Sequence, residues 1–292
     1  MEYDMPLFRP PSEARSLIFQ VTLGCSWNRC VFCAMYKTKD YLVRPFEDIE
    51  RDVMEMSRRY PDTRKIFLAD GDPLAAPTDH LLRVLDLMNR SFPALERIST
   101  YAGPTNLRLK TLHELQEFRA RKLDVLYLGI ETGNDRLLKK IRKGATADGI
   151  VEVCRKAIDA GLRMSTFIIL GLGGVEGSYD HIKDSAKVAN AIDPHFLATL
   201  TLMLGPYEKL YEEEIMGGGF KLIDKRQSLQ EVRWFVEDLT LTNCKFGSEH
   251  ASNYLPISGT LPRDKGEILR LIDTALADMS SRLIRPEWAR GL

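Results

Sequence analysis

The strongest constraint on the fold is a regular alternation of short apolar runs with amphipathic segments. The apolar runs, which are typical of strands covered on both faces, are Leu17–Val21, Lys65–Ala69, Arg97–Tyr101, Val125–Ile130, Met164–Leu170 and Phe196–Leu204. Apolar residues recur at steps of three and four, as in helices, in Phe46–Arg59, Thr78–Asn89, Thr111–Arg121, Thr146–Ala160 and Ser178–Ala191. Thr78 and Ser178 are the expected N-caps of their helices. Because a helix follows each strand, we expect parallel pairing through right-handed crossovers.

The least ordinary residues come directly after these predicted strands. A cysteine-rich loop follows the first strand, and later strands are followed by Asp70-Gly71-Asp72-Pro73, Glu131-Thr132-Gly133, Gly171-Leu172-Gly173-Gly174 and Gly205-Pro206. In barrels and open α/β sheets alike, ligands bind at the carboxyl ends of the strands. We therefore expect these segments to form one rim that carries the chemistry.

The cysteine-rich loop places Cys25, Cys30 and Cys33 within nine residues. Three thiolates without a fourth ligand nearby suit a [4Fe–4S] cluster that keeps one open iron. Structural zinc is the alternative, but it normally takes four protein ligands. A fourth ligand would have to come from a distant residue: Cys154, Cys244, His80, His113, His181, His195 or His250. Disulfides are not expected, because Met1–Pro11 has no apolar core typical of a secretory signal.

This loop and the strand before it resemble the radical S-adenosylmethionine (SAM) superfamily. That superfamily usually spaces its cysteines C-x3-C-x2-C; here four residues separate Cys25 from Cys30, whereas Cys30-Val31-Phe32-Cys33 keeps the C-x-aromatic-C form. The resemblance leans to the coproporphyrinogen-dehydrogenase-like and Elongator-like branch. It implies an α/β fold, a partial (βα)6 TIM-type barrel, to which the change of pattern after residue 205 adds a C-terminal α+β extension. We expect a lead-in at residues 1–15, a core barrel at 16–205 and an extension over the barrel mouth at 206–292.

The resemblance also implies which residues bind SAM. The loop after the second strand looks like the Gly-Gly-Glu-Pro loop that carries the methionine amine. Glu131 matches the acidic residue of a Gly-x-Glu-Ser-Gly segment that serves the ribose or the amine, and Met164–Gly174 matches the strand that contacts adenine. The implied cofactor-binding residues are Phe32, Asp70, Gly71, Asp72, Pro73, Glu131, Arg142, Leu170, Gly171 and Met203. Each also has an ordinary structural reading: a turn for the Asp-Gly-Asp-Pro loop, an ion pair with Arg142 or Lys143 for Glu131, and core packing for the apolar residues.

The activity implied is that of an oxygen-sensitive radical SAM enzyme. Electron delivery to the cluster would cleave the SAM sulfonium, and the resulting 5′-deoxyadenosyl radical would abstract hydrogen from an unidentified substrate. A reductant such as flavodoxin or ferredoxin would be needed. The rival interpretation is a non-catalytic iron–sulfur/SAM or haem carrier built on the same barrel, since one fold can host many functions.

The pattern changes from Pro206 onward. Helices are predicted at Tyr207–Ile215, near Leu229–Val236 and at Lys265–Leu283, with a polar, turn-rich segment at Asn243–Pro262. That segment holds His250 and Cys244, which are our candidates for groups that act on the substrate. An ordinary surface loop with an inert, buried Cys244 is the alternative.

Composition limits the partners and the compartment. Lys plus Arg and Asp plus Glu both number 41, so the formal net charge is zero and neither nucleic acid nor an anionic membrane is indicated. The longest apolar stretch, around Phe167–Val175, is broken by glycines and is too short to span a bilayer. Five cysteines without a secretory signal favour a reducing compartment. We expect a soluble, cytoplasmic protein with a small-molecule substrate.

Overall fold

The computed structural model describes residues 1–205 and 208–291, and the chain packs into two compact units. The first unit comprises Met1–Leu128 and Val153–Met164. The second comprises Gly129–Glu152 and the chain from Ser165 onward. Pro206 and Tyr207, at the expected start of the C-terminal extension, lie outside the described residues, and the three-part division of the chain stays a prediction.

The first unit is built on parallel strands. β1 (Leu17–Gln20), β4 (Lys65–Ala69), β5 (Arg97–Tyr101) and the first part of β6 (Leu123–Glu131) pair in that order, all in parallel. These strands confirm the four that the apolar runs predicted in this part of the chain. A small antiparallel pair that the sequence did not reveal, β2 (Thr22–Leu23) with β3 (Leu42–Val43), follows β1 and brackets the cysteine loop.

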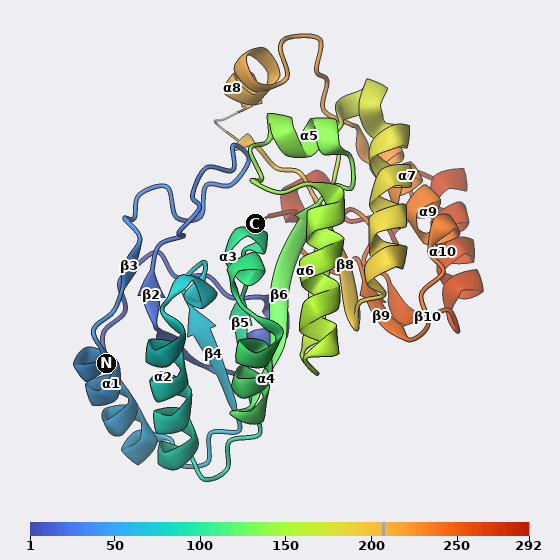
Figure 1. Cartoon of the computed structure of the whole chain (residues 1–292). Coiled ribbons are helices and arrows are strands. Elements are labelled where there is room, and N and C mark those ends of the chain that lie inside the picture. Colours follow the sequence, from blue (N-terminus) through green and yellow to red (C-terminus); the bar gives the residue numbers. More distant parts are fainter. Residues whose placement is uncertain (206–207, 292) are drawn as a thin grey trace. The chain divides into compact units, whose positions relative to one another are not determined.

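Both faces of these strands are covered, which explains their continuous apolar character. Helices α1 (Phe46–Arg59), α2 (Thr78–Ser91) and α4 (Leu112–Ala120) lie side by side along one face (Figure 1). On the other face Phe67 and Tyr127 pack with Tyr3 and Leu7 of the N-terminal segment. The shorter helices are η1 (Pro11–Glu13), η2 (Pro73–Ala75) and α3 (Pro104–Leu109), and α6 (Ala147–Asp159) contributes its second half to this unit.

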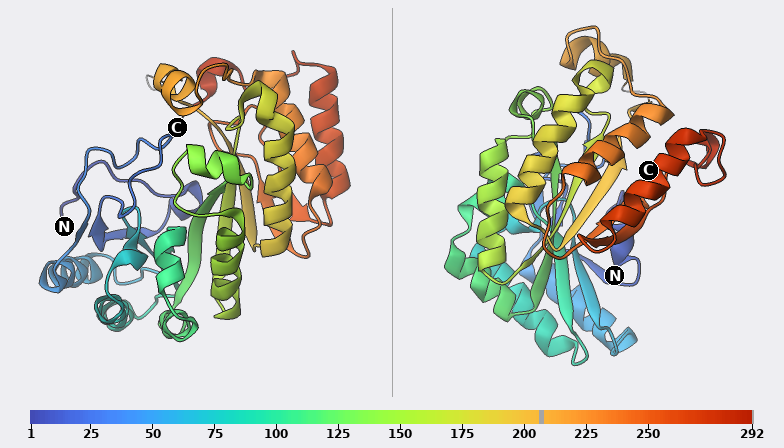
Figure 2. Two further views of the ribbon diagram at one scale, coloured as in Figure 1. Left: turned by 45° about the horizontal axis from the view of Figure 1, so that its top comes forward. Right: turned by 90° about the vertical axis from the view of Figure 1, so that its right-hand side faces the viewer.

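The second unit has β7 (Arg163–Leu170), β8 (Phe196–Thr201), β9 (Cys244–Gly247) and β10 (Ser258–Leu261) in that order. β7, β8 and β9 are parallel, and β10 runs antiparallel to β9. Helices α7 (Gly174–Ile192), α9 (Lys225–Asp238) and α10 (Lys265–Ala277) form a layer, side by side in both Figure 1 and Figure 2. The smaller elements are α5 (Asp135–Lys140), α8 (Glu208–Leu210), a π-helical turn at Tyr211–Ile215 and η5 (Glu287–Ala289).

Three sequence predictions are wrong in detail. The segment Asn243–Pro262 is not one irregular loop, because it contains β9 and β10, whose four residues each are too few to show an alternating pattern clearly. Ser178 does not cap α7, which begins four residues earlier and encloses it. Thr78 is the first residue of α2, after Pro77 as N-cap. Within 1–205 and 208–291, none of the helices is long and apolar enough to cross a membrane.

Candidate functional site

The three clustered cysteines lie on an irregular loop between β2 and β3, in the first unit. Cys25, Cys30 and Cys33 are all partly exposed, which leaves their thiols accessible to a metal cluster. The loop is fastened at its neck, where the Asn28 amide donates to the Tyr36 carbonyl at 2.8 Å. Among residues 1–205 and 208–291, no three Cys, His, Asp or Glu side chains are already gathered around one point in a way that would hold a metal ion. Metal loops commonly converge only through their metal bonds, and three thiols on one exposed loop suit a [4Fe–4S] cluster.

Asp70 fixes the start of the cysteine loop. Its buried carboxylate accepts from the Gly24 amide at 3.0 Å and from the Gln20 side chain at 2.9 Å, and it pairs with the Lys39 ammonium at 3.0 Å. The Gly71 amide donates to the Gly24 carbonyl at 2.9 Å. The loops that follow the first two predicted strands therefore lie next to each other in this unit, as predicted. Both oxygens of Asp70 are occupied by the protein itself.

Asp72 fastens the same loop two residues further along. Its buried carboxylate accepts from the Ser26 hydroxyl at 2.9 Å, from the Gly103 amide at 3.3 Å and from the Asn106 amide. Burial raises the pKa of Asp72, and the hydrogen bonds from Asn106 and Ser26 oppose that rise. The Asp72 side chain thus holds Ser26, the neighbour of Cys25, in place.

Gly71 stands against the first cysteine. A Cβ added at Gly71 would come within 2.9 Å of the Cys25 Cβ and 3.0 Å of the Tyr36 ring. A glycine is required there because any side chain would displace Cys25. Pro73 begins the short helix η2 and is buried, whereas Phe32 is partly exposed on the cysteine loop. With both carboxylates engaged, the backbone is the part of this loop that remains for an ammonium group.

In the second unit, Glu131 ends β6 in an unusual state for a carboxylate. It is buried, has a positive φ of 65°, and pairs with the Lys143 ammonium through Oε1 at 2.6 Å. Its other oxygen, Oε2, is buried without a hydrogen-bond partner among the described residues. Arg142, which the sequence analysis put forward, is exposed; its neighbour Lys143 is the residue beside Glu131. An unpaired buried acceptor on a strained residue is typical of a ligand site.

Gly129 and Gly133 lie two residues to either side of Glu131, and each is needed for a steric reason. A Cβ at Gly129 would overlap Glu131 Oε1 and crowd the Phe167 ring, so Gly129 makes the room into which the carboxylate turns back. A Cβ at Gly133 would overlap the backbone of Asp184 in α7, so Gly133 permits close packing of the strand end on that helix. The spacing of Gly129, Glu131 and Gly133 thus has a direct steric cause.

The turn after β7 is held by a residue that the sequence analysis missed. Glu231, on α9, is buried and accepts from the Gly171 amide at 2.7 Å and from the Ser178 hydroxyl at 2.5 Å. Burial raises the pKa of Glu231 to about 8, although these two hydrogen bonds oppose the rise. Gly171 itself has a φ of 80°, which favours glycine. The sequence signal that could have revealed Glu231 is its position among the apolar residues of an amphipathic helix.

His181 is another buried group of this unit. Its Nδ1 lies 2.7 Å from the Thr132 hydroxyl, and its Nε2 lies 3.0 Å from the Ile169 carbonyl. The carbonyl can only accept, so Nε2 carries the proton and Nδ1 accepts from Thr132. Burial lowers the pKa of His181 to about 4, so the ring is neutral at neutral pH. His181 joins the ends of β6 and β7.

Cys244 and His250, the two residues proposed to act on the substrate, do not line the cavity that this unit has at the ends of β7 and β8. Cys244 is buried in β9, and burial raises the pKa of its thiol to about 12, so it is held as a neutral thiol. His250 is partly buried, with Nδ1 at 2.8 Å from the Ser252 hydroxyl, and burial, followed by the charge of Arg285, lowers its pKa. Neither lines the cavity, and their catalytic roles stay predictions.

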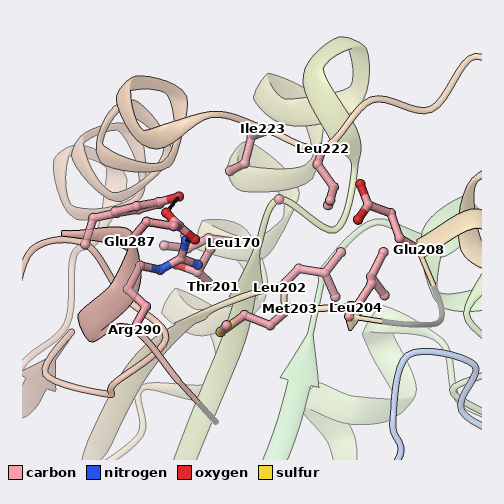
Figure 3. A pocket seen from close by; sticks show the side chains of 13 residues that line it. Leu170, Thr201, Leu202, Met203, Leu204, Glu208, Leu222, Ile223, Glu287 and Arg290 are labelled. Atoms are coloured by element: carbon pink, nitrogen blue, oxygen red, sulfur yellow. Dashed lines mark hydrogen bonds and ion pairs between the residues drawn. The ribbon is translucent and has the colours of Figure 1, made fainter. Parts of the chain in front are cut away.

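The cavity, of about 220 Å³, lies at the ends of β7 and β8 (Figure 3). Leu170, Gly171 and Met203, which the sequence analysis proposed for SAM, line it together with residues of the C-terminal segment, defined as residues 208–291. Tyr254 belongs to the turn-rich segment that the sequence analysis singled out, whereas Glu287 and Arg290 were missed because isolated polar residues form no pattern. Figure 3 shows Arg290 and Glu287 together on one side of the cavity and Glu208 on the opposite side.

Comparisons with known proteins show the family of the chain. The model of the radical SAM superfamily matches residues 19–188, more than half of the chain, and the protein therefore belongs to that superfamily. The cofactors of the superfamily are a [4Fe–4S] cluster and SAM, as the sequence analysis predicted. The matched range contains the three clustered cysteines, the Asp70–Pro73 loop and Glu131.

Curated relatives match only part of their own length. The heme chaperone HemW of Bacillus subtilis is 24% identical over 155 residues, covering 52% of this chain and 40% of that protein. A tRNA-2-methylthio-N(6)-dimethylallyladenosine synthase of Burkholderia mallei is 28% identical over 200 residues, covering 61% of this chain and 41% of that protein. The chain thus spans about two fifths of these relatives.

Solved structures support the fold. Coproporphyrinogen III oxidase (HemN) from Escherichia coli, described as a radical SAM enzyme, has a TM-score of 0.58 at 18% identity, covering 76% of this chain and 51% of that one. The radical SAM methyltransferase TsrM from Kitasatospora setae, solved with cobalamin and a [4Fe–4S] cluster, has a TM-score of 0.54 at 15% identity, covering 68% and 40%. They confirm the predicted α/β fold with a mostly parallel sheet of the partial-barrel type.

Proposed function

We propose that the protein is a radical SAM enzyme that holds a [4Fe–4S] cluster on Cys25, Cys30 and Cys33 and cleaves SAM to abstract hydrogen from a small-molecule substrate. The observation that carries the proposal is the cysteine loop itself, fastened by Asp70 and Asp72 in a chain of this superfamily. When bound, the cluster supplies the electron that breaks the SAM C–S bond and an iron site for the methionine end. All other tasks fall to the protein.

Each of these tasks has a group suited to it. Backbone carbonyls of the Asp70–Pro73 loop accept from the SAM ammonium, since the side chains of this loop are occupied. Glu131 Oε2 accepts from a ribose hydroxyl or the amine of SAM, because a hydrogen-bond donor removes the cost of burying this oxygen without a partner. The apolar ends of β7 and β8, around Leu170 and Met203, cover the adenine and exclude water. Arg142, which is exposed beside Lys143, is proposed to pair with the methionine carboxylate.

The partners follow from the same chemistry. An external reductant such as flavodoxin or ferredoxin delivers the electron, and the cluster needs a reducing compartment, which we propose is the cytoplasm. The tRNA named for one relative is not carried over, because the chain covers 41% of that protein and has no formal net charge to offer a polyanion.

A second candidate is a haem carrier that keeps the cluster and SAM site without turnover. It is favoured by the similarity to a protein named heme chaperone, at 24% identity. The two candidates differ in one product. An enzyme forms 5′-deoxyadenosine from SAM in the presence of dithionite, whereas a carrier binds haem with a Soret absorption and forms none.

The decisive experiment is anaerobic reconstitution of the full chain followed by iron, sulfide and 5′-deoxyadenosine analysis. We expect about four iron and four sulfide per chain. Cys25→Ala, Cys30→Ala and Cys33→Ala should each abolish loading, whereas Cys154→Ser, on α6 outside the loop, should load normally. Stoichiometric zinc that iron does not displace would refute the proposal.

A further inference from the structure

Arg290 lines the cavity and has a hydrogen-bond donor without a partner among the described residues. Its side chain is only 5% exposed. Nε donates to the Ser252 carbonyl at 2.7 Å and Nη1 to Glu287 Oε1 at 2.6 Å. Within residues 1–205 and 208–291, Nη2 has no partner. Nη2 is not among the buried unpartnered atoms, so this nitrogen is open to solvent in the cavity wall and can donate to an acceptor bound there.

The guanidinium is held rigidly. It stacks 3.8 Å above the Tyr254 ring, whose hydroxyl donates to Glu287 Oε2 at 2.8 Å. The turn that carries Tyr254 is fastened to β8, because Asn253 accepts from the Thr201 hydroxyl at 2.9 Å and donates to the Thr199 carbonyl at 2.6 Å. Rigid placement lowers the entropy lost when an anion binds.

The charges and the apolar side chains that line the cavity determine which ligand can bind beside Arg290. Arg290 is the cation of the cavity, while Glu208 and Glu287 are acidic and the remaining lining is mainly apolar, including Leu202, Met203 and Ile223. Glu287 is 71% exposed, so solvent screens its charge and Arg290 keeps most of its attraction for an anion. One guanidinium matches the charge and planar shape of a carboxylate, whereas a phosphate dianion would need further cations.

We infer that this cavity contains a substrate subsite that binds a carboxylate on Arg290 and an apolar body against Leu222 and Ile223, which leaves the ends of β7 and β8 to the adenine of SAM. It rests on the proposed function only in calling the occupant a substrate. The methionine end of SAM needs no part of it, because the superfamily places that end on the cluster. The C-terminal segment then selects the substrate through Tyr254 and Arg290, rather than through His250.

The test is a ligand-observed NMR titration of the reconstituted full chain, saturated with SAM, using 3-phenylpropionate as the probe and 3-phenylpropanol as its neutral match. The wild-type protein should prefer the carboxylate by about tenfold or more, as expected for a charge-assisted hydrogen bond. Arg290→Gln should remove that preference while still binding the alcohol and cleaving SAM. Arg263→Gln, which removes an equal charge at a 75% exposed site in the same segment, should leave both affinities unchanged.

Other variants separate binding from folding. Arg290→Lys should keep part of the preference, because it retains the charge but loses the planar fork. Glu287→Gln should bind the carboxylate at least as tightly, since a neighbouring anion is removed. The inference is overturned if the wild type does not distinguish the two probes, if Arg290→Gln loses both equally, if phenyl phosphate binds more tightly than 3-phenylpropionate, or if Arg290→Gln weakens SAM in parallel. Absence of SAM cleavage by the wild type would refute the proposed function and leave this titration valid.

Discussion

Glu131 joins burial, a positive φ and an unpaired oxygen in one residue. A carboxylate that served only to pair with Lys143 would gain nothing from the strained backbone or from leaving Oε2 without a donor. Each of these features costs free energy in the absence of a ligand. They are offset when a hydroxyl or ammonium group of the bound cofactor donates to Oε2.

We predict that Glu131→Gln weakens SAM binding by about tenfold to a hundredfold, the range for loss of a charge-assisted hydrogen bond. The iron content should be unchanged, because Glu131 is not in the cysteine loop. Equilibrium dialysis with the reconstituted protein measures the affinity, and iron analysis measures the loading.

Gly129→Ala provides an independent variant for the same residue. The added methyl group occupies the space of Glu131 Oε1, so the carboxylate must move without any change in its chemistry. Its SAM affinity should fall in parallel with that of Glu131→Gln. Glu152→Gln, an exposed change on α6, is the matched control. Wild-type affinity in both Glu131→Gln and Gly129→Ala would make Glu131 a structural residue.

At the level of single residues, the sequence indicated positions but not partners. The motif located Glu131 because glycines and a carboxylate at the end of a strand can be recognised from the sequence alone. It could not decide between Arg142 and Lys143, since two consecutive residues after a short helix differ only in the direction of their side chains. Asp70 and Asp72 were correctly placed beside the cysteine loop, yet only the structure showed their oxygens bound to Gly24, Lys39 and Ser26.

At the level of elements, α9 shows how the C-terminal segment stabilises the turn after β7. It inserts the Glu231 carboxyl between the Gly171 amide and the Ser178 hydroxyl. The residue was missed because a Glu on a helix is normally solvent-exposed. Its neighbours Ser228, Leu229, Val232 and Phe235 are buried, so it belongs to the inner stripe of the helix. β4 and β6 were predicted well because burial on both faces makes these strands almost continuously apolar.

Glu231 should make stability depend on pH. Its pKa is about 8 in the folded protein against 4.5 for an ordinary Glu, so between these values the folded state binds more protons than the unfolded state. The free energy of unfolding should therefore fall as the pH rises through this window, by at most about 1.4 kcal/mol per pH unit. Below the window the contribution is fully present.

Glu231→Gln should remove this dependence, because the amide can accept from Gly171 and donate to Ser178 without ionising. Its stability relative to wild type should increase from about pH 5 to pH 8, as measured by urea denaturation. Glu237→Gln, exposed on the same helix, should show a constant difference over that range. If Glu231→Gln and the wild type respond equally to pH, Glu231 does not titrate in this window.

At the level of the whole molecule, the residues that we propose bind SAM fall into two groups, one in each compact unit. The cysteine loop and the Asp70–Pro73 loop belong to the first unit, and Glu131, Gly171 and Met203 belong to the second. The alternation of strands and helices predicted the architecture that carries them. It could not predict the division of the chain, which depends on long-range packing between segments distant in sequence.

SAM should therefore slow hydrogen exchange in segments of both units. We expect added protection around Gly24–Cys33 and Asp70–Pro73 in the first unit, and around Gly129–Thr132, Leu170–Gly174 and Leu202–Gly205 in the second, because local opening of these segments would require loss of the ligand. Helices α1 and α10 contain none of the proposed SAM residues and serve as internal controls. β9, which pairs with both β8 and β10, should exchange slowly with or without SAM, whereas the turn between β9 and β10 should respond only if it lies close to the ligand. Protection confined to one unit would contradict the assignment of SAM-binding residues to the other.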